Sequence, residues 1–275
     1  MLATLLALVA AAAATAAALG IRRWLRARRR APPRPARPRY PIVLAHGFLG
    51  FDELSLGANR HAYFRGVAGQ LESMGVKVYS PRVPMAAAIA TRAERLAELI
   101  RALPDERVNI VAHSMGGLDA RYAISRLGLA DRVASLTTIA TPHLGTPLAD
   151  MGKALLGRLV RMAGRFIDLR AFTDLTTAQM EKFNREIGNA PGVSYGSVVA
   201  RSGRLRTNPL LWASHLYLSS RAGPNDGIVP SASQPWGEVV LRVEADHWAQ
   251  IGWSRGFDAG DLYQQLLGDL RGRGV

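Results

Sequence analysis

The stretch Val108-Asn-Ile-Val-Ala-His-Ser-Met-Gly-Gly-Leu-Asp-Ala-Arg121 decides the fold of this chain. Residues 108–111 are a short apolar run rich in β-branched side chains, which predicts one buried strand. Small residues surround Ser114 in the segment that follows: Ala112, Gly116 and Gly117. A helical pattern begins at Leu118. The order of strand, sharp turn and helix predicts a nucleophile elbow with Ser114 at its apex. The alternative is a serine in an ordinary loop between a strand and a helix.

The composition is that of a globular chain, with 48% hydrophobic and 20% charged residues among 275. This length allows one α/β domain and an appendage. Cysteine is absent, which excludes disulfides, thiolate metal sites and a cysteine nucleophile. The net charge is +14, but nine arginines lie before Tyr40 with no acidic residue among them, and the rest of the chain carries +5. No nucleic-acid-binding motif accompanies them, so we expect no nucleic-acid partner.

Residues 1–30 begin with an apolar stretch, 1–21, that is rich in alanine and leucine. As a helix it would span roughly 31 Å, just enough to cross a bilayer. Six arginines follow in residues 22–30, and by the positive-inside rule they predict a membrane anchor with the following domain in the cytoplasm. The alternative is a cleaved signal peptide, which would give a secreted or periplasmic protein. Residues 31–39 are rich in proline and arginine and predict an extended linker.

Strands and helices alternate from residue 40 to the end of the chain, which predicts a mostly parallel sheet with helices on both faces. The expected strands are 42–45, 76–79, 108–111, 133–139, 194–200, 215–218 and 238–244. The expected helices include 63–74, a helix capped by Thr91 that ends at Leu103, and 174–187.

An amphipathic helical insertion is predicted at about residues 148–187. Apolar residues recur there at three- and four-residue steps from Leu148 to Leu169, and basic residues occupy the other face. The insertion either packs on its own domain as an ordinary helix or forms a lid over an apolar acyl pocket, opening against lipid.

Three residues predict the site of a serine hydrolase: Ser114, Asp226 and His247. Each follows a predicted strand, and their order along the chain is Ser, Asp, His. A serine nucleophile needs a base within hydrogen-bond reach, and we expect His247 to be that base. Asp226 is expected to hold the tautomer of His247 and to stabilise its imidazolium. Asp246 is the rival for the acid, but as the immediate neighbour of His247 it is poorly placed to reach the ring.

The loop after strand 42–45 reads His46-Gly47-Phe48. We expect the backbone N–H groups of Phe48 and Met115 to form an oxyanion hole. Four further titratable residues are expected to have structural roles in turns, at caps or on the surface: His46, His143, Asp119 and Asp131.

Five segments occur in order over residues 40 to about 251: Tyr40-Pro-Ile-Val-Leu-Ala-His-Gly-Phe-Leu-Gly-Phe-Asp52, Val108-Asn-Ile-Val-Ala-His-Ser-Met-Gly-Gly117, Thr141-Pro-His-Leu-Gly145, Gly192-Val-Ser-Tyr195 and Asn225-Asp-Gly-Ile-Val229. As a set they resemble the bacterial triacylglycerol lipases of the true-lipase group, in the α/β-hydrolase superfamily. The resemblance implies that fold and a lipase or carboxylesterase activity. It also implies a Ser114, Asp226, His247 triad and an oxyanion hole made by Phe48 and Met115.

This chain differs from that group in two features, a calcium site and a disulfide. Secreted members carry a calcium site with an aspartate two residues after the catalytic histidine, where this chain has Ala249. No aspartate occurs between Tyr195 and Ser219 to act as the other acidic ligand, and the disulfide of those relatives cannot form. We therefore expect no metal and no cofactor.

The sequence thus predicts a serine hydrolase that cleaves carboxylic esters of lipids through an acyl-enzyme. Its expected organisation is an anchor or signal at 1–30, a linker at 31–39 and an α/β-hydrolase domain at 40–275 with a lid at about 148–187. The expected partners are a lipid or ester substrate and a membrane contacted through the N-terminal helix. The alternatives are a thioesterase, a phospholipase or an acyltransferase of the same fold, or a non-catalytic lipid-binding module.

Overall fold

The computed structural model describes residues 37–48, 63–85, 87–154, 170–254 and 256–275. The chain divides into two units, 1–36 and 37–275, and every described residue belongs to the second. The predicted anchor or signal at 1–30 and most of the predicted linker therefore lie outside the described residues. So does the middle of the predicted lid.

The location predicted from the sequence is corrected by the structure. Across the described ranges, no helix is long and apolar enough to cross a membrane, whereas the prediction required one such helix. The stretch that suggested it, residues 1–21, lies outside the described residues. On this finding the predicted membrane-anchored, cytoplasmic location is wrong, and a membrane partner held through an N-terminal helix is not supported.

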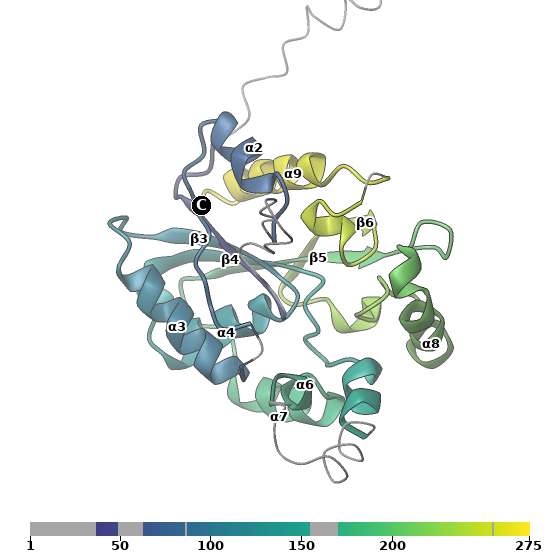
Figure 1. The fold of residues 1–275 in the computed structure, drawn as a ribbon. Coiled ribbons are helices and arrows are strands. Elements are labelled where there is room, and N and C mark those ends of the chain that lie inside the picture. Colours follow the sequence, from purple (N-terminus) through teal and green to yellow (C-terminus); the bar gives the residue numbers. More distant parts are fainter. Residues whose placement is uncertain (1–36, 49–62, 86, 155–169, 255) are drawn as a thin grey trace, which may run out of the picture. The chain divides into compact units, whose positions relative to one another are not determined.

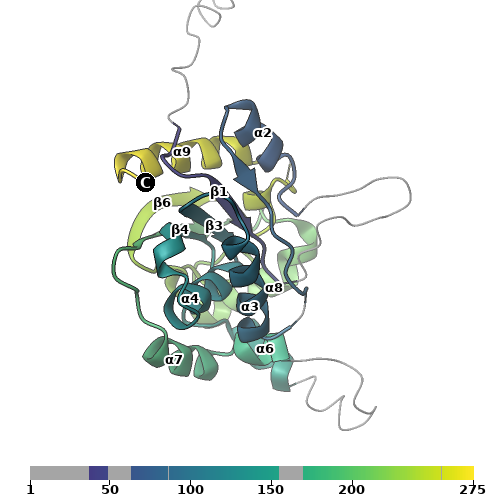
Figure 2. The ribbon, with the colours of Figure 1, turned by 90° about the vertical axis from the view of Figure 1, so that its left-hand side faces the viewer.

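A parallel sheet forms the centre of residues 37–275 (Figures 1 and 2), and its strand order is β2-β1-β3-β4-β5-β6. The strands are β1 Ile42–Ala45, β2 Val78–Tyr79, β3 Val108–His113, β4 Val133–Ile139, β5 Ser194–Arg201 and β6 Glu238–Glu244. Because all the strands run the same way, their carboxyl ends meet at one edge, where sites form in sheets of this kind. The predicted parallel sheet is confirmed.

Helices cover both faces of this sheet. The described helices include α2 Val67–Ser73, α3 Ile89–Arg101, α4 Gly116–Arg126, α6 Arg170–Asp174, α7 Thr177–Glu186, α8 Trp212–Ala222 and α9 Ala259–Gly272. Helices α2 and α9 lie together on one face, and α3 and α4 pack on the other (Figures 1 and 2). This is the arrangement expected when buried parallel strands alternate with amphipathic helices.

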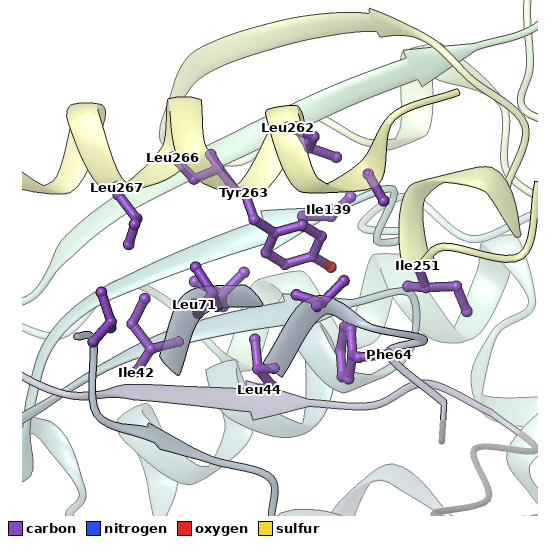
Figure 3. Packing of buried hydrophobic residues seen from close by; sticks show 14 of the residues in the cluster. Ile42, Leu44, Phe64, Leu71, Ile139, Ile251, Leu262, Tyr263, Leu266 and Leu267 are labelled. Atoms are coloured by element: carbon purple, nitrogen blue, oxygen red, sulfur yellow. The ribbon is translucent and has the colours of Figure 1, made fainter. Parts of the chain in front are cut away.

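Alternation of side chains along β1 divides the core between the two faces. Ile42 and Leu44 join the cluster under α2 and α9, whereas Val43 and Ala45 join the cluster under α3 and α4. Successive strand residues point to opposite faces, so a strand buried on both sides must be apolar throughout. Figure 3 shows the first cluster, in which side chains of α9, including Leu266, reach down towards α2 and β1.

Besides shifts of a few residues at the ends of several helices and strands, two predicted elements differ from the structure. Residues 215–218, predicted as a strand, lie within α8, because a four-residue apolar run is too short for its period to separate a strand from a helix. Helix α3 begins at Ile89, with Ala88 as its N-cap, so Thr91 is inside the helix rather than at its cap. One difference concerns the type of an element and the other the first residue of a helix, and neither changes the order of strands in the sheet.

The core cluster predicts the effect of a leucine truncation. Leu266 of α9 is 1% exposed, and we expect Leu266→Ala to lower the free energy of unfolding by about 2–5 kcal/mol, through lost burial and the cavity left behind. Leu205 is 97% exposed, so Leu205→Ala is the matched control and should change stability by less than about 0.5 kcal/mol. Urea denaturation followed by circular dichroism measures both; equal effects would contradict the packing described here.

Candidate active site

Ser114 lies in a strained turn between β3 and α4. Its φ is 56°, in the left-handed region that residues with a side chain rarely adopt. Neighbouring groups hold it there: the Ser114 N–H donates to the Ile139 carbonyl at 2.9 Å, and Thr141 Oγ1 donates to the Ser114 carbonyl at 2.7 Å. The structure thus contains the predicted strand, sharp turn and helix, with the serine at the apex.

Glycines let the loop after β1 lie directly against this turn. A Cβ on Gly116 would lie 2.6 Å from the Ala45 carbonyl oxygen, and a Cβ on Gly47 would lie 2.7 Å from the Cβ of Ser114. Atoms cannot approach so closely, so both positions require glycine. Phe48 follows Gly47 in the chain, and its backbone is therefore held beside the serine.

His247 and Asp226 form a buried pair. His247 Nδ1 lies 2.8 Å from Asp226 Oδ2, and neither side chain is more than 6% exposed. Asp226 Oδ1 accepts from the backbone N–H groups of Ile228 at 3.0 Å and Val229 at 2.7 Å. Gln250 Nε2 donates to Oδ2 at 3.2 Å. A carboxylate with these donors accepts from Nδ1–H, which leaves Nε2 of His247 as the basic atom.

The sequence predicted that Asp226 follows a strand, but the structure has no strand directly before it. It lies in the loop after α8, and this loop is tied to the base by a backbone bond from the His247 N–H to the Asp226 carbonyl at 2.8 Å. The rival, Asp246, is bonded elsewhere. Its carboxylate accepts from the N–H groups of Asn208, Trp248 and Ala249 at 2.8–3.0 Å and so secures the loop that carries His247.

His113, the residue before Ser114, lies against His247. The rings of His113 and His247 have centroids 4.4 Å apart at an interplanar angle of 49°. Burial lowers the pKa of His113 well below its usual value, with a further contribution from His247, so its ring is neutral at physiological pH. Within the described part of the chain, no hydrogen bond joins the Ser114 hydroxyl to His247. The structure thus pairs Asp226 with His247 and places this pair beside the Ser114 turn.

The peptide between Gly47 and Phe48 is held from its carbonyl side. The Gly47 oxygen lies 3.0 Å from His46 Nδ1 and accepts from Arg92 Nη2 at 3.2 Å. His46 Nε2 accepts from the Val83 N–H at 3.2 Å, so the proton is on Nδ1, which donates to that oxygen. In a trans peptide the N–H points opposite to the C=O, so these bonds direct the Phe48 N–H away from Arg92.

The N–H groups of Phe48 and Met115 make no hydrogen bond within the described residues. The Phe48 ring packs edge-on against Phe172 at 4.9 Å, and Met115 and Phe48 share an apolar cluster with Leu175 and Met180. An apolar wall from α6 and α7 therefore adjoins the two N–H groups.

Arg92 and Asp119 form a second buried pair, which the sequence did not predict. Arg92 Nε donates to Asp119 Oδ2 at 2.8 Å, and both side chains are 1% exposed or less. Arg92 also donates to the carbonyls of His46 at 2.7 Å and Pro84 at 2.6 Å. Burial raises the pKa of Asp119 to about 7, against the opposing effect of Arg92. Asp119 was expected to be a surface charge or cap. The sequence did hold a sign of a buried partner for it: Arg92 lies four residues before Leu96 and therefore on the apolar face of α3.

The remaining histidine candidate has a structural setting. His143 is fully buried, stacks on Trp236 at 5.4 Å, and its Nδ1 accepts from Arg121 at 3.1 Å. Burial, followed by the charge of Arg121, lowers the pKa of His143 well below its usual value. Among the residues that the structure describes, no group of three or more His, Cys, Asp or Glu could hold a metal ion.

Comparison with known proteins supports a lipase or esterase. The family model for the alpha/beta hydrolase fold matches residues 40–178. Triacylglycerol lipase 2 of Saccharomyces cerevisiae is 32% identical, over 78% of this chain and 81% of that protein. A triacylglycerol lipase of Pseudarthrobacter phenanthrenivorans is 29% identical, over 85% of this chain and 91% of its own length. The crystal structure of a metagenomic carboxyl esterase superposes with a TM-score of 0.73 at 21% identity, covering 88% of this chain and 77% of that one.

The bonds of Arg92 predict a positioning role. Arg92→Lys keeps a positive charge near Asp119 but cannot reach several carbonyls at once. We expect kcat for p-nitrophenyl butyrate to fall about 10- to 100-fold with little change in KM, less than the full loss of one oxyanion donor. Arg95→Lys is the control, because Arg95 lies on the same helix with a side chain 52% exposed. Thermal melts show whether both variants fold; an unchanged kcat in folded Arg92→Lys would refute the role.

Proposed function

The chain belongs to the alpha/beta hydrolase fold family and is a carboxylic ester hydrolase, and we propose that it cleaves lipid esters through an acyl-enzyme formed on Ser114. The observation that carries the proposal is the strained Ser114 turn, which lies at the same sheet edge as the buried pair of His247 and Asp226. Nucleophilic catalysis requires a hydroxyl, a base that can activate it and a group that orients the base, and this combination supplies the residue types for all three.

In the first half of the proposed reaction, Ser114 Oγ attacks the ester carbonyl carbon and its proton passes to His247 Nε2. Asp226 accepts from Nδ1–H throughout, so it holds the tautomer and stabilises the imidazolium that forms. The fully buried Asp226 carboxylate is supported by the N–H groups of Ile228 and Val229. His247 then gives the proton to the departing alcohol, and the acyl group remains on the serine.

The developing oxyanion would be bound by the N–H groups of Phe48 and Met115. Each such donor contributes about 2.7–4 kcal/mol to transition-state stabilisation in hydrolases of this type. Fixing the Gly47 carbonyl supports the Phe48 donor before substrate arrives, so the protein need not reorganise during the reaction. In the second half, water activated by His247 attacks the acyl-enzyme and releases the acid.

A lipid acyl chain is the proposed substrate portion, and two observations support it. The relatives named above are triacylglycerol lipases. In this chain the oxyanion donors adjoin the apolar wall of Phe172, Leu175 and Met180. We propose that the insertion at about 148–187, to which this wall belongs, is the lid of the acyl site. Its helical residues 147–154, α6 and α7 flank a segment outside the described residues.

Reaction with a fluorophosphonate probe tests the nucleophile. We expect the protein to be labelled and Ser114→Ala to lose the label, with hydrolysis of p-nitrophenyl butyrate reduced by at least about 10⁴-fold. The control is Ser73→Ala, because Ser73 is an exposed serine of α2 that should be dispensable. Labelling that survives in Ser114→Ala would end the proposal. A series of p-nitrophenyl esters and acyl-thioesters of increasing chain length then identifies the preferred acyl group.

Two aspartates near His247 give a second test. Asp226→Asn is nearly isosteric but cannot stabilise the imidazolium, and we expect kcat to fall by about 10⁴-fold. Asp246→Asn is the matched control: it weakens bonds to three backbone N–H groups, so thermal stability should fall while kcat changes by less than about tenfold. Kinetics and thermal melts of both variants separate the two roles. The reverse ranking of kcat would assign the acid to Asp246.

A further inference from the structure

Exposed apolar side chains are concentrated on one short segment. Large hydrophobic residues with substantial exposure in the described part of the chain number seven, and four of them fall within residues 205–216. We call these four the α8 surface, and their exposed fractions are 97% for Leu205, 80% for Leu210, 41% for Trp212 and 48% for Leu216. Isolated exposed leucines are ordinary, whereas a cluster of this kind marks an interaction site.

The four residues lie close together along the chain and on connected elements. Trp212 and Leu216 are four residues apart on α8 and therefore lie on the same side of the helix. Leu210 lies in the short 3₁₀ turn Pro209–Leu211 that leads into α8. Trp212 Nε1 donates to the Thr207 carbonyl at 2.9 Å and ties the preceding loop, with Leu205, to the same surface.

Positive charge is interleaved with these apolar side chains. Arg204, Arg206 and Arg221 are exposed, and the sequence has no acidic residue from 202 to 225. Among the described residues, the guanidinium groups of Arg204 and Arg206 make no hydrogen bond or ion pair. Two acids lie beside this segment: Glu244 is bonded to Arg201 at 2.7 Å, and Asp246 accepts from the Asn208 N–H at 2.8 Å. Apolar and aromatic groups combined with unpaired arginines suit a surface of anionic lipid.

The α8 surface adjoins the catalytic edge. The Asn208 N–H is bonded to Asp246, the neighbour of His247, and Asn225, the neighbour of Asp226, donates to Ser219 of α8 at 3.1 Å. Figure 1 shows α8 beyond the carboxyl end of β5. A lipid surface that contacts this segment would therefore lie beside the acid–base pair.

We propose that the α8 surface docks on anionic lipid, which holds the catalytic edge against the lipid phase. The benefit of docking rests on the proposed function, but the binding experiment below does not require hydrolysis. Leucine and tryptophan side chains would enter the acyl–headgroup boundary, and Arg204 and Arg206 would contact lipid phosphates.

A position-specific fluorophore tests docking directly. The chain has no cysteine, so Leu210→Cys accepts a single nitrobenzoxadiazole label. Arg271→Cys carries the control label: it is exposed in α9, and its neighbour Arg273 bonds to Ser194 at the start of β5, at the opposite edge of the sheet. Vesicles of phosphatidylcholine alone are compared with vesicles containing about one third phosphatidylglycerol. Both contain a lipid with a quencher on its acyl chain.

We expect quenching of the label at position 210 in the anionic vesicles and none at position 271. The arginines before Tyr40 attract anionic vesicles by themselves, so quenching rather than total binding is the readout. No quenching at 210 in vesicle-bound protein would overturn the proposal. Equal quenching in phosphatidylcholine would refute its anionic part. A concentration-dependent change without vesicles would assign the surface to a second copy of the chain.

Activity gives an independent measurement. Combining Leu205→Asp with Leu210→Asp should lower hydrolysis of an ester emulsion containing phosphatidylglycerol by about tenfold or more, because two apolar contacts with lipid are lost. Hydrolysis of soluble p-nitrophenyl butyrate should stay within about twofold of the parent, because exposed positions tolerate substitution. Equal losses on both substrates would overturn the docking role. Ser114→Ala should abolish hydrolysis and leave quenching at 210 intact, so the two proposals fail separately.

Discussion

The contact between the loop after β1 and the serine turn is the constraint on which the site depends. Gly47 and Gly116 allow two backbone segments, about 70 residues apart in the chain, to approach more closely than any side chain would permit. This approach places Phe48 beside the serine turn, as the proposed oxyanion hole of the Phe48 and Met115 N–H groups requires. It also explains why the serine can keep a φ of 56°: β4 and the β1 loop hold the turn from both sides.

Burial divides the titratable groups into those that can change charge and those that cannot. His113 and His247 have ring centroids 4.4 Å apart, and two imidazolium ions at that distance would repel each other. The desolvation that lowers the pKa of His113 keeps its ring neutral, so in the proposed reaction the positive charge would reside on His247 alone. Asp226 is bonded to His247 Nδ1, and its negative charge also favours a positive charge on His247 rather than on His113.

The sequence predicted those parts of the molecule that depend on short-range patterns. The apolar, β-branched run at 108–111 is followed at once by small residues around Ser114, and the two patterns together indicate a strand and a tight turn. The pairing of Arg92 with Asp119 could not be predicted in this way, because it depends on how α3 packs on α4. The predicted membrane location is overturned by a different finding: no helix among the described residues is long and apolar enough to cross a membrane, and residues 1–21 lie outside them. The strand predicted at 215–218 failed because four residues fit either period.

The bonds of Arg92 have a consequence for how this fold can be recombined. The guanidinium connects three pieces of chain, namely the carbonyls of the β1 loop, the carbonyl of Pro84 before α3, and the carboxylate on α4. A transplant of the β1 loop alone into another scaffold would leave its carbonyls without their donor. The smallest module that can be exchanged between such proteins is therefore discontinuous, consisting of the β1 loop, α3 and the first turns of α4 together.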